Sequence, residues 1–334
     1  MKRKSILFSG VGKAEYVEQD MLPMEEESVK VRMEYTVVSA GTERANIMGM
    51  PNAGGNKFPK QLGYCGVGIV EETGSLVTKV KKGDRVLVYH GKHTSHNIVS
   101  QDKVTLVEDD NIDSREAAFV IIASMGLGGV RKLELEIGES AMVMGLGLLG
   151  IFAVQFLRQS GAMPLIVADL NPERRKLALE LGADYAFDPS DEDFVEKVKA
   201  VTKGKGVNAC VEVTGVSAAM SQALDCAAYM GRISLLGCTR VSDCGVDYYR
   251  KVHRPGVKLI GAHNLVRPKV ESYPHHWTHQ DDCKAILDMI TMGRIKVLPI
   301  ISRIVSPEKC PEIYTELCTS KDFPLGTVFD WRNI

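Results

Sequence analysis

Short apolar runs with alternating or β-branched residues dominate the first third of the chain. They lie at residues 29–39 (VKVRMEYTVVS), 66–73 (GVGIVEET) and 84–90 (DRVLVYH), and turns rich in Gly, Pro and Lys separate them. Runs of this kind are typical of β-strands. We therefore expect a β-rich N-terminal region.

From residue 140 the pattern changes to short strands that alternate with helical segments. Residues 140–146 (SAMVMGL) and 164–170 (PLIVADL) are nearly uninterrupted apolar runs, and apolar residues at helical spacing follow the first of them. The helix predicted after the second run begins at Asn171, has Pro172 at its first position and ends at Gly182. The alternation continues in the segments YAFDP, DEDFVEKVKAVT, VNACVEVTG, GRISLLG and VKLIGA. Six strands with intervening helices predict an α/β fold with a parallel, doubly wound sheet.

The tail after residue 285 returns to mixed structure and ends in the strand-like GTVFDW. Because 334 residues exceed what one hydrophobic core usually supports, we expect two domains. We predict a discontinuous β-rich domain, residues 1–118 and 285–334, that is interrupted by an α/β domain, residues 119–284.

Composition and charge narrow the possible partners. The chain is 45% apolar and 25% charged, and its net charge of −1 gives no electrostatic reason to bind nucleic acid or an anionic membrane. The N-terminal apolar run Ile6–Phe8 is too short for a signal peptide, and no stretch approaches the roughly 18 to 20 apolar residues that span a bilayer. The sequence therefore predicts a cytoplasmic protein with a small-molecule substrate.

The cysteines form no CxxC pair, and several lie in apolar surroundings. Free thiols in a reducing compartment are the expected state. The eight residues are Cys65, Cys210, Cys226, Cys238, Cys244, Cys283, Cys310 and Cys318.

Residues 145–150 read GLGLLG, which matches the pattern G-x-G-x-x-G. The motif ends a predicted strand and opens a predicted helix, and Asp169 ends the next strand 24 residues after Gly145. In this context the glycines let a pyrophosphate approach the backbone, the helix N-terminus attracts the anion, and the carboxylate binds ribose hydroxyls. The sequence therefore predicts a dinucleotide site. Asp169 favours NAD, because a carboxylate repels the 2′-phosphate of NADP.

Further cofactor contacts are expected from the ends of later strands, where ligands of such sheets bind. Thr214 and Gly215 should flank the nicotinamide together with Gly237 and Cys238, although ordinary strand–loop turns are the alternative. Arg174 either accepts a phosphate, packs near the adenine or is a solvated helix residue. The predicted set is Gly145, Gly147, Leu148, Leu149, Gly150, Asp169, Leu170, Arg174, Thr214, Gly215, Gly237 and Cys238.

The chain resembles the medium-chain dehydrogenase/reductase superfamily, and within it the alcohol and polyol dehydrogenases. The resemblance covers nearly the full length and rests on VSAGTERANIMG (38–49), FPKQLGYCGVGIVEETG (58–74), KKGDRVLV (81–88), MVMGLGLLG (142–150) and VADLNPERRKLALELGAD (167–184). It implies a GroES-like β-rich catalytic domain, a Rossmann domain, a substrate in the cleft between them and usually a homodimer or homotetramer.

The chain departs from the zinc-dependent members of this family at the ligand positions. Those members have Cys-Gly-Thr-Asp where residues 40–43 read AGTE, and Gly-His-Glu where residues 63–65 read GYC. Alanine cannot bind a metal, and neutral phenol is a poor zinc ligand. The four-cysteine structural lobe is missing too, since no cysteine lies between Cys65 and Cys210. We therefore expect no metal.

A rebuilt metal site is the alternative. It would use Cys65, Glu43 and one of the three histidines in the segment YHGKHTSHN, which are His90, His93 and His96.

Without zinc, another group must take the hydroxyl proton as hydride leaves the alcohol carbon. Tyr64 stands where the lost histidine would be, and its phenol could donate a hydrogen bond or, with a lowered pKa, act as a base. Thr42 occupies the position of the family's proton relay, and Glu43 and Cys65 are its neighbours by the same resemblance. Among the histidines we prefer His96, although a surface or strand-edge role is the alternative.

Residues 261–282 (GAHNLVRPKVESYPHHWTHQDD) are rich in His, Trp, Tyr and Pro. The segment follows the sixth predicted strand, so it should run near the nicotinamide. Aromatic faces pack on sugar rings and imidazoles bond to hydroxyls, which suits a polyol, whereas a subunit-contact loop is the alternative. The predicted substrate residues are His263, Asn264 and Trp277.

Together these features predict an NAD-dependent dehydrogenase that acts on a secondary alcohol of a polyol, sugar or cyclitol without catalytic zinc. A quinone or enone reductase is the first alternative, because such relatives also lack zinc, but they more often prefer NADPH. A non-catalytic NAD-binding protein is the second.

Overall fold

The computed structural model describes residues 2–55, 57–243 and 245–334. The chain divides into two compact units: the first unit contains residues 1–122 and 283–334, and the second unit contains residues 123–282. Cys244 lies outside the described residues, and the seven other cysteines are free thiols.

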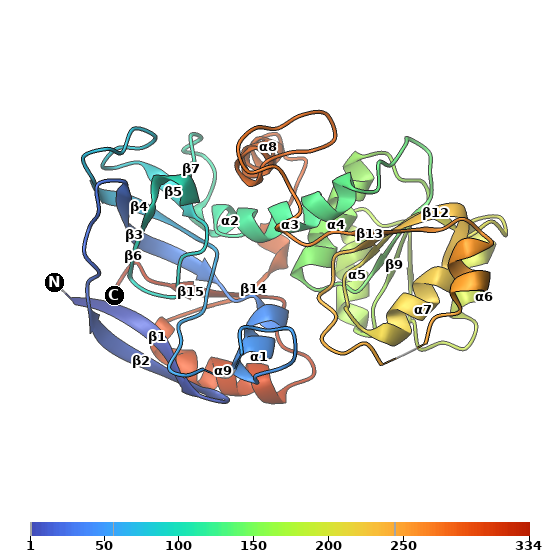
Figure 1. Cartoon of the computed structure of the whole chain (residues 1–334), viewed down its shortest axis with the longest axis horizontal. Helices are drawn as coiled ribbons and strands as arrows, with labels where there is room; N and C mark the ends of the chain where they lie inside the picture. The colour runs from blue at the N-terminus through green and yellow to red at the C-terminus, as the bar shows by residue number, and fades with distance from the viewer. Residues whose placement is uncertain (1, 56, 244) are drawn as a thin grey trace. The chain divides into compact units, whose positions relative to one another are not determined.

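The first unit is built on antiparallel β-structure (Figure 1). Within the described residues, β1 pairs with β2, and a separate sheet has the order β14-β15-β3-β4-β5-β7, with β6 also paired to β3. The strands are β1 (Lys2–Gly10), β2 (Lys13–Asp20), β3 (Ser28–Val37), β4 (Gly66–Thr73), β5 (Arg85–Val88), β6 (His96–Ser100), β7 (Val104–Leu106), β14 (Ile301–Val305) and β15 (Gly326–Asp330). Because β15 pairs with β3, the C-terminal tail completes the sheet that the N-terminal region begins.

In the described part of the chain, the α-helices that carry residues of the first unit include four besides α3 (Val120–Arg131). They are α1 (Ala40–Ile47), α2 (Ser114–Ala117), α8 (His279–Thr291) and α9 (Cys310–Thr319). Tyr314 on α9 packs edge-to-face on Phe8 of β1, with ring centroids 4.7 Å apart, so the tail also contributes to the core of this unit.

The second unit contains a parallel sheet with the order β10-β9-β8-β11-β12-β13 among the described residues. Its strands are β8 (Ala141–Met144), β9 (Leu165–Ala168), β10 (Tyr185–Phe187), β11 (Val207–Glu212), β12 (Ala227–Leu235) and β13 (Lys258–Gly261). The helices α3 (Val120–Arg131), α4 (Leu148–Gln159), α5 (Pro172–Glu180), α6 (Phe194–Val201) and α7 (Ser217–Cys226) accompany it (Figure 1). The predicted α/β class is confirmed, since the first unit is β-rich and the second is built on a parallel sheet with helices.

Local signals set the limits of α5 as expected. The Asn171 side chain accepts hydrogen bonds from the backbone of Glu173 and Arg174, Pro172 occupies the first position, and Gly182 follows the end of the helix with φ of 117°. In the described part of the chain, no helix combines the length and the apolar character needed to cross a membrane.

Candidate active site

The glycine loop joins β8 to α4 at the carboxyl edge of the parallel sheet. Gly145 has φ of 96°, and a Cβ atom at Gly150 would lie 1.9 Å from the carbonyl oxygen of Gly145, so this turn requires glycine. At Gly147, by contrast, a Cβ atom would meet nothing within 4 Å, so the backbone is open to an approaching ligand.

The N-terminus of α4 points its free amides into this open space. Gly147 is the N-cap and supplies no side-chain acceptor, so the amides of Leu148, Leu149 and Gly150 at the helix start lack a side-chain cap. Free amides and the helix dipole together form an anion site, which is what a pyrophosphate needs.

Asp169 follows β9 and lies against the loop. One carboxylate oxygen accepts from the Leu146 amide at 2.6 Å, and the other accepts from the Asn171 amide at 2.8 Å. Each oxygen keeps a second lone pair, so the carboxylate can still accept from ribose hydroxyls. The next residue, Leu170, is exposed.

Two adjacent arginines of α5 have different surroundings. Arg174 lies in the first turn, where its amide is capped by Asn171. Arg175 reaches back to the carbonyl oxygen of Asp169 at 2.5 Å and to the Asp188 carboxylate at 2.9 Å. Arg175 thereby links the residues that follow β9 and β10. The sequence pattern did not indicate this structural role.

The ends of β11 and β12 meet beside the glycine loop. A Cβ atom at Gly145 would lie 2.7 Å from the Thr214 methyl carbon, and one at Gly237 would lie 2.4 Å from the Gly215 amide nitrogen. Cys238 continues this edge and is exposed. The structure thus brings the predicted residues of three strand ends together, and this part of the chain fits a dinucleotide.

A buried polar cluster in the first unit is centred on Glu43 of α1, which is 1% exposed. Its carboxylate accepts from the Ser39 amide at 2.8 Å and from the Tyr314 hydroxyl at 2.6 Å, and His93 Nε2 lies 3.2 Å from both oxygens. All of its oxygens therefore have donors, which a fully buried carboxylate requires.

A second row of hydrogen bonds fixes the His93 ring. Trp331 Nε1 donates to Thr36 Oγ1 at 2.9 Å, and Thr36 Oγ1 lies 2.7 Å from His93 Nδ1. The Glu43 carboxylate can only accept, so Nε2 donates to it, and in the neutral ring Nδ1 is then the acceptor of the Thr36 hydroxyl proton. Sequence reasoning named His93 as one of three candidate histidines and missed Thr36, Tyr314 and Trp331.

Tyr64 lies next to the cluster and donates from its hydroxyl to Ser39 Oγ at 2.6 Å. Burial raises the pKa of Tyr64 well above the ordinary value, and this outweighs the hydrogen bonds to Ser39 and Thr42 that lower it. A base would need a lowered pKa, so the predicted base role does not fit, and donation of a hydrogen bond to the substrate stays a prediction. Thr42 itself is exposed on α1.

Cys65 and His96 do not take part in the cluster. Cys65 is buried, its Sγ lies 3.6 Å from the Val37 carbonyl oxygen, and burial raises the pKa of its thiol. His96 lies on β6 with Nε2 3.4 Å from Glu71, and burial lowers its pKa. The histidine beside Glu43 is therefore His93, not the preferred His96.

The residues at these positions do not fit a zinc ion. Ala40 offers no donor, Tyr64 stays protonated, and the Glu43 oxygens already accept hydrogen bonds. Among residues 2–55, 57–243 and 245–334, no three His, Cys, Asp or Glu side chains gather so that they could hold a metal ion. The alternative site built from Cys65, Glu43 and a histidine thus finds no support in the geometry.

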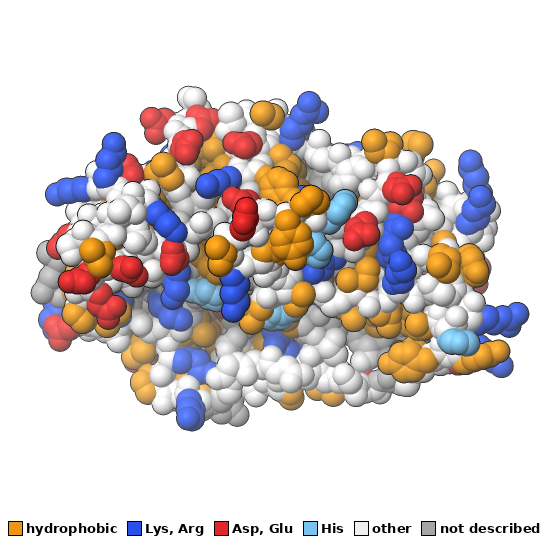
Figure 2. Space-filling model, turned by 45° about the horizontal axis from the view of Figure 1, so that its top comes forward, with side chains coloured by type: hydrophobic (Ala, Val, Ile, Leu, Met, Phe, Trp, Pro, Cys, Tyr) orange, Lys and Arg blue, Asp and Glu red, His pale blue; other side chains and the backbone are white. Residues whose placement is uncertain are grey.

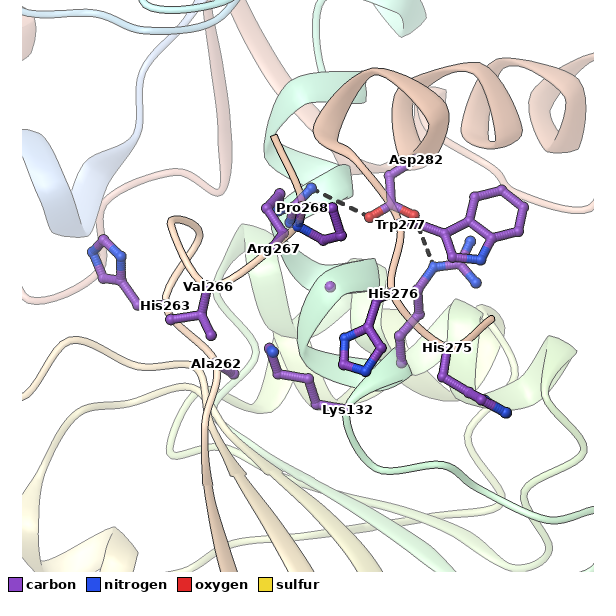
Figure 3. A pocket seen from close by; sticks show the side chains of 12 residues that line it. Lys132, Ala262, His263, Val266, Arg267, Pro268, His275, His276, Trp277 and Asp282 are labelled. Atoms are coloured by element: carbon purple, nitrogen blue, oxygen red, sulfur yellow. Dashed lines mark hydrogen bonds and ion pairs between the residues drawn. The ribbon is translucent and has the colours of Figure 1, made fainter. Parts of the chain in front are cut away.

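The predicted substrate segment forms a pocket within the second unit (Figure 3). His263 and Trp277 line it, whereas Asn264 is not among its lining residues. Arg131 of α3 stacks over the Trp277 ring at 4.0 Å, and its Nε donates to Asp282 at 2.7 Å. The segment therefore presents charged as well as aromatic groups.

A glycine loop between a parallel strand and a helix, followed by an acidic residue at the next strand end, defines a dinucleotide-dependent enzyme. Two family models match the chain: the alcohol dehydrogenase GroES-like domain over residues 25–132, and the zinc-binding dehydrogenase model over residues 149–264. The chain belongs to the medium-chain alcohol/polyol dehydrogenase superfamily and is an oxidoreductase of that type.

The similar curated proteins are dehydrogenases. D-guloside 3-dehydrogenase of Escherichia coli (strain K12) is 27% identical over 265 residues, which cover 78% of this chain and 75% of that protein. L-threonine 3-dehydrogenase of Pyrococcus furiosus is 40% identical over 209 residues, 54% of this chain and 59% of the relative. Sorbitol dehydrogenase of Bacillus subtilis (strain 168) is 28% identical over 209 residues, which cover 54% of this chain and 59% of that protein.

Solved structures share the fold over the whole length. Galactitol-1-phosphate dehydrogenase from Escherichia coli superposes with a TM-score of 0.85 at 18% identity, over 98% of this chain and 99% of that one. A structure from Sinorhizobium meliloti 1021 with NADP bound gives a TM-score of 0.83 at 20% identity, over 99% of both chains.

Proposed function

We propose that this chain uses NAD to oxidise a secondary alcohol of a polyol, sugar or cyclitol to a ketone, or to catalyse the reverse reaction, without catalytic zinc. The observation that carries the cofactor assignment is the position of Asp169, whose carboxylate is held at 2.6 Å from the amide of Leu146 in the glycine loop. A negative charge fixed there disfavours a 2′-phosphate and favours free ribose hydroxyls.

The substrate class is supported by the relatives, whose names include sorbitol and threonine dehydrogenases. The enone reductase alternative gains no comparable support from the site, because Asp169 counts against a preference for NADPH. We further propose that the first unit is the catalytic domain and the second the cofactor domain. A cytoplasmic location and a homodimer or homotetramer stay predictions.

Bound NAD would accept a hydride from the alcohol carbon, so the hydroxyl proton must leave through residues of this chain. Tyr64 and Ser39 supply two hydroxyls 2.6 Å apart, and exposed Thr42 lies on the same helix as Glu43. We assign the proton path to these hydroxyls, with solvent at exposed Thr42 as the final acceptor. Each hydroxyl gives up one proton as it takes another, so the phenol is not ionised. Glu43 is a positioning residue, because it holds the Ser39 backbone at 2.8 Å.

One assay tests this function. The purified protein is incubated with a panel of polyols, cyclitols and aldoses, each with NAD and with NADP, and the absorbance of the reduced cofactor is followed. We expect turnover of at least one secondary alcohol with a clear preference for NAD. A clear preference for NADP(H), or reduction of quinones and enones in place of alcohol oxidation, would overturn the proposal.

A further inference from the structure

The pocket in the second unit holds more positive charge than its own residues neutralise. Among its lining residues are Arg131, Lys132 and Arg267, and the one carboxylate that lines it is Asp282. Asp282 is 2% exposed, so it faces the two arginines and not the solvent. Three cations and one anion leave an excess of two positive charges.

Asp282 fixes both guanidinium groups in place. Its Oδ1 accepts from Arg131 Nε at 2.7 Å and its Oδ2 lies 3.2 Å from Arg267 Nη1. Arg267 also donates to the Ser124 carbonyl oxygen at 3.2 Å, and the Trp277 ring supports Arg131. Guanidinium groups held in this way lose little freedom when they bind an anion.

Lys132 is the cation without a partner. It is partly buried, and no hydrogen-bonding or ion-pair partner lies next to it in the part of the chain that the structure describes. Burial lowers the pKa of Lys132, and the nearby charge of Arg267 lowers it further. A cation that is both desolvated and beside another cation is stabilised by an anion.

Three histidines line the pocket, and in Figure 3 the side chains of His263 and His275 point away from Lys132. His263 is exposed, and its Nδ1 accepts from the Leu265 amide at 3.2 Å, which fixes the ring at the rim of the pocket. Figure 3 shows the Lys132 and His276 side chains next to each other below Arg267 and Pro268. The pocket is open to solvent and its inner space is about 20 Å³, which is room for one water-sized group, so an anion would enter with its oxygen atoms first.

The pocket lies at the same edge of the sheet as the glycine loop. Ala262, the first residue after β13, donates its amide to Leu235 of β12, and β13 lies two strands from β11 and Thr214. Two strand spacings are about 10 Å, which a sugar-sized molecule can bridge. The surrounding segment also exposes Leu265, Val266, Val270 and Tyr273, and Figure 2 shows hydrophobic and histidine side chains gathered near the middle of the view.

We infer that this pocket binds an anionic group, a phosphate or a carboxylate, on the polyol or sugar substrate. The inference rests on the proposed function, because it treats the ligand as the substrate of that reaction. The shared chemistry is an oxyanion that accepts a hydrogen bond from Lys132 and is attracted by the Arg267 guanidinium near it.

The test compares a neutral polyol with two anionic counterparts: sorbitol, sorbitol 6-phosphate and gluconate. Direct calorimetric binding and steady-state kinetics are measured on wild-type protein, Lys132→Gln and the control Lys284→Gln, which removes an exposed lysine of α8 outside the pocket. We expect one anionic compound to bind at least about tenfold more tightly than sorbitol, and Lys132→Gln to remove most of this difference. Lys284→Gln should retain it.

The outcomes separate this inference from the proposed function. Turnover of sorbitol with no preference for either anion would keep the function and overturn the pocket. Anion binding that Lys132→Gln abolishes, without turnover of any compound, would support the pocket and overturn the function. If Lys132→Gln and Lys284→Gln weaken binding of the anionic compound equally, the effect is due to general surface charge, and the inference about the pocket is overturned. Which of the two anions binds more tightly decides between a phosphate and a carboxylate.

Discussion

Tyr64 is the side chain on which the proposed proton transfer depends. Its hydroxyl donates to Ser39 Oγ at 2.6 Å, and burial keeps the phenol protonated. Tyr64 therefore contributes a positioned neutral hydroxyl to catalysis and not a negative charge. In this it differs from a site in which zinc stabilises the alkoxide of the substrate.

The first prediction concerns this hydroxyl. Tyr64→Phe should lower kcat by more than about tenfold, because it breaks the hydroxyl pair, while the affinity for NADH stays unchanged. Stopped-flow turnover and NADH fluorescence titration measure the two quantities. Tyr229→Phe, at an exposed tyrosine, is the control. Unchanged turnover would assign Tyr64 to packing.

The second prediction concerns cofactor choice. Asp169→Ala should lower the ratio of kcat/KM for NAD to that for NADP by at least about tenfold, because the variant no longer repels a 2′-phosphate. The control is Glu180→Ala, which removes an exposed carboxylate at the other end of α5. If the two variants show the same ratio, Asp169 does not select the cofactor.

At the scale of elements, the strand–loop–helix unit from β8 to α4 carries the cofactor. Two glycines of its loop serve different purposes. Gly150 is required by the fold, since its Cβ atom would lie 1.9 Å from the Gly145 carbonyl oxygen, whereas Gly147 has nothing within 4 Å.

The third prediction follows from this contrast. Gly147→Ala should leave the free energy of unfolding nearly unchanged and weaken NADH binding by about tenfold or more, because the added methyl occupies only ligand space. Gly150→Ala should weaken both stability and binding, since the loop must move. Urea unfolding and NADH titration give the values. A stable Gly147→Ala protein with unchanged NADH affinity would show that the ligand does not approach this backbone.

Elements with local signals could be predicted from the sequence. The glycine loop, the cap at Asn171 and the parallel strands follow from residues close in the chain, and these set the cofactor part of the candidate site. The hairpin β1–β2 was not predicted, because its short apolar runs are interrupted by charged residues.

The buried cluster could not be predicted for a different reason. Glu43 meets Tyr314, which is 271 residues away and looks like an ordinary apolar position of an amphipathic helix. His93 lies in an irregular segment before β6, where no period indicates which of three histidines faces inwards. Only the three-dimensional pairing of the tail with β3 brings these groups together.

At the scale of the molecule, the two units together bury cysteine thiols and tyrosine phenols, and the unfolded chain would release the protons of these groups at high pH. Burial raises the pKa of these groups, to about 12 for Cys226 and Cys310. The groups are Cys65, Cys210, Cys226, Cys310, Tyr64 and Tyr314.

The fourth prediction is alkaline destabilisation. Below the ordinary pKa values of 9.0 for thiols and 10.0 for phenols, both states hold these protons and stability is unaffected. Above those values the unfolded chain binds fewer protons than the folded one, so the free energy of unfolding falls as pH rises. Urea unfolding at a series of pH values between about pH 8 and about pH 10.5 measures this fall in the free energy of unfolding. A flat profile over this range would contradict the assignment of these groups as buried and protonated.

The central claim is that this chain transfers hydride to NAD without a metal ion. The most direct test is the rate of NADH formation from an accepted polyol, measured on protein dialysed against a chelator, with the zinc content determined on the same sample. We expect full activity in protein that holds no stoichiometric zinc. Loss of activity together with bound zinc, and recovery when zinc is returned, would contradict it.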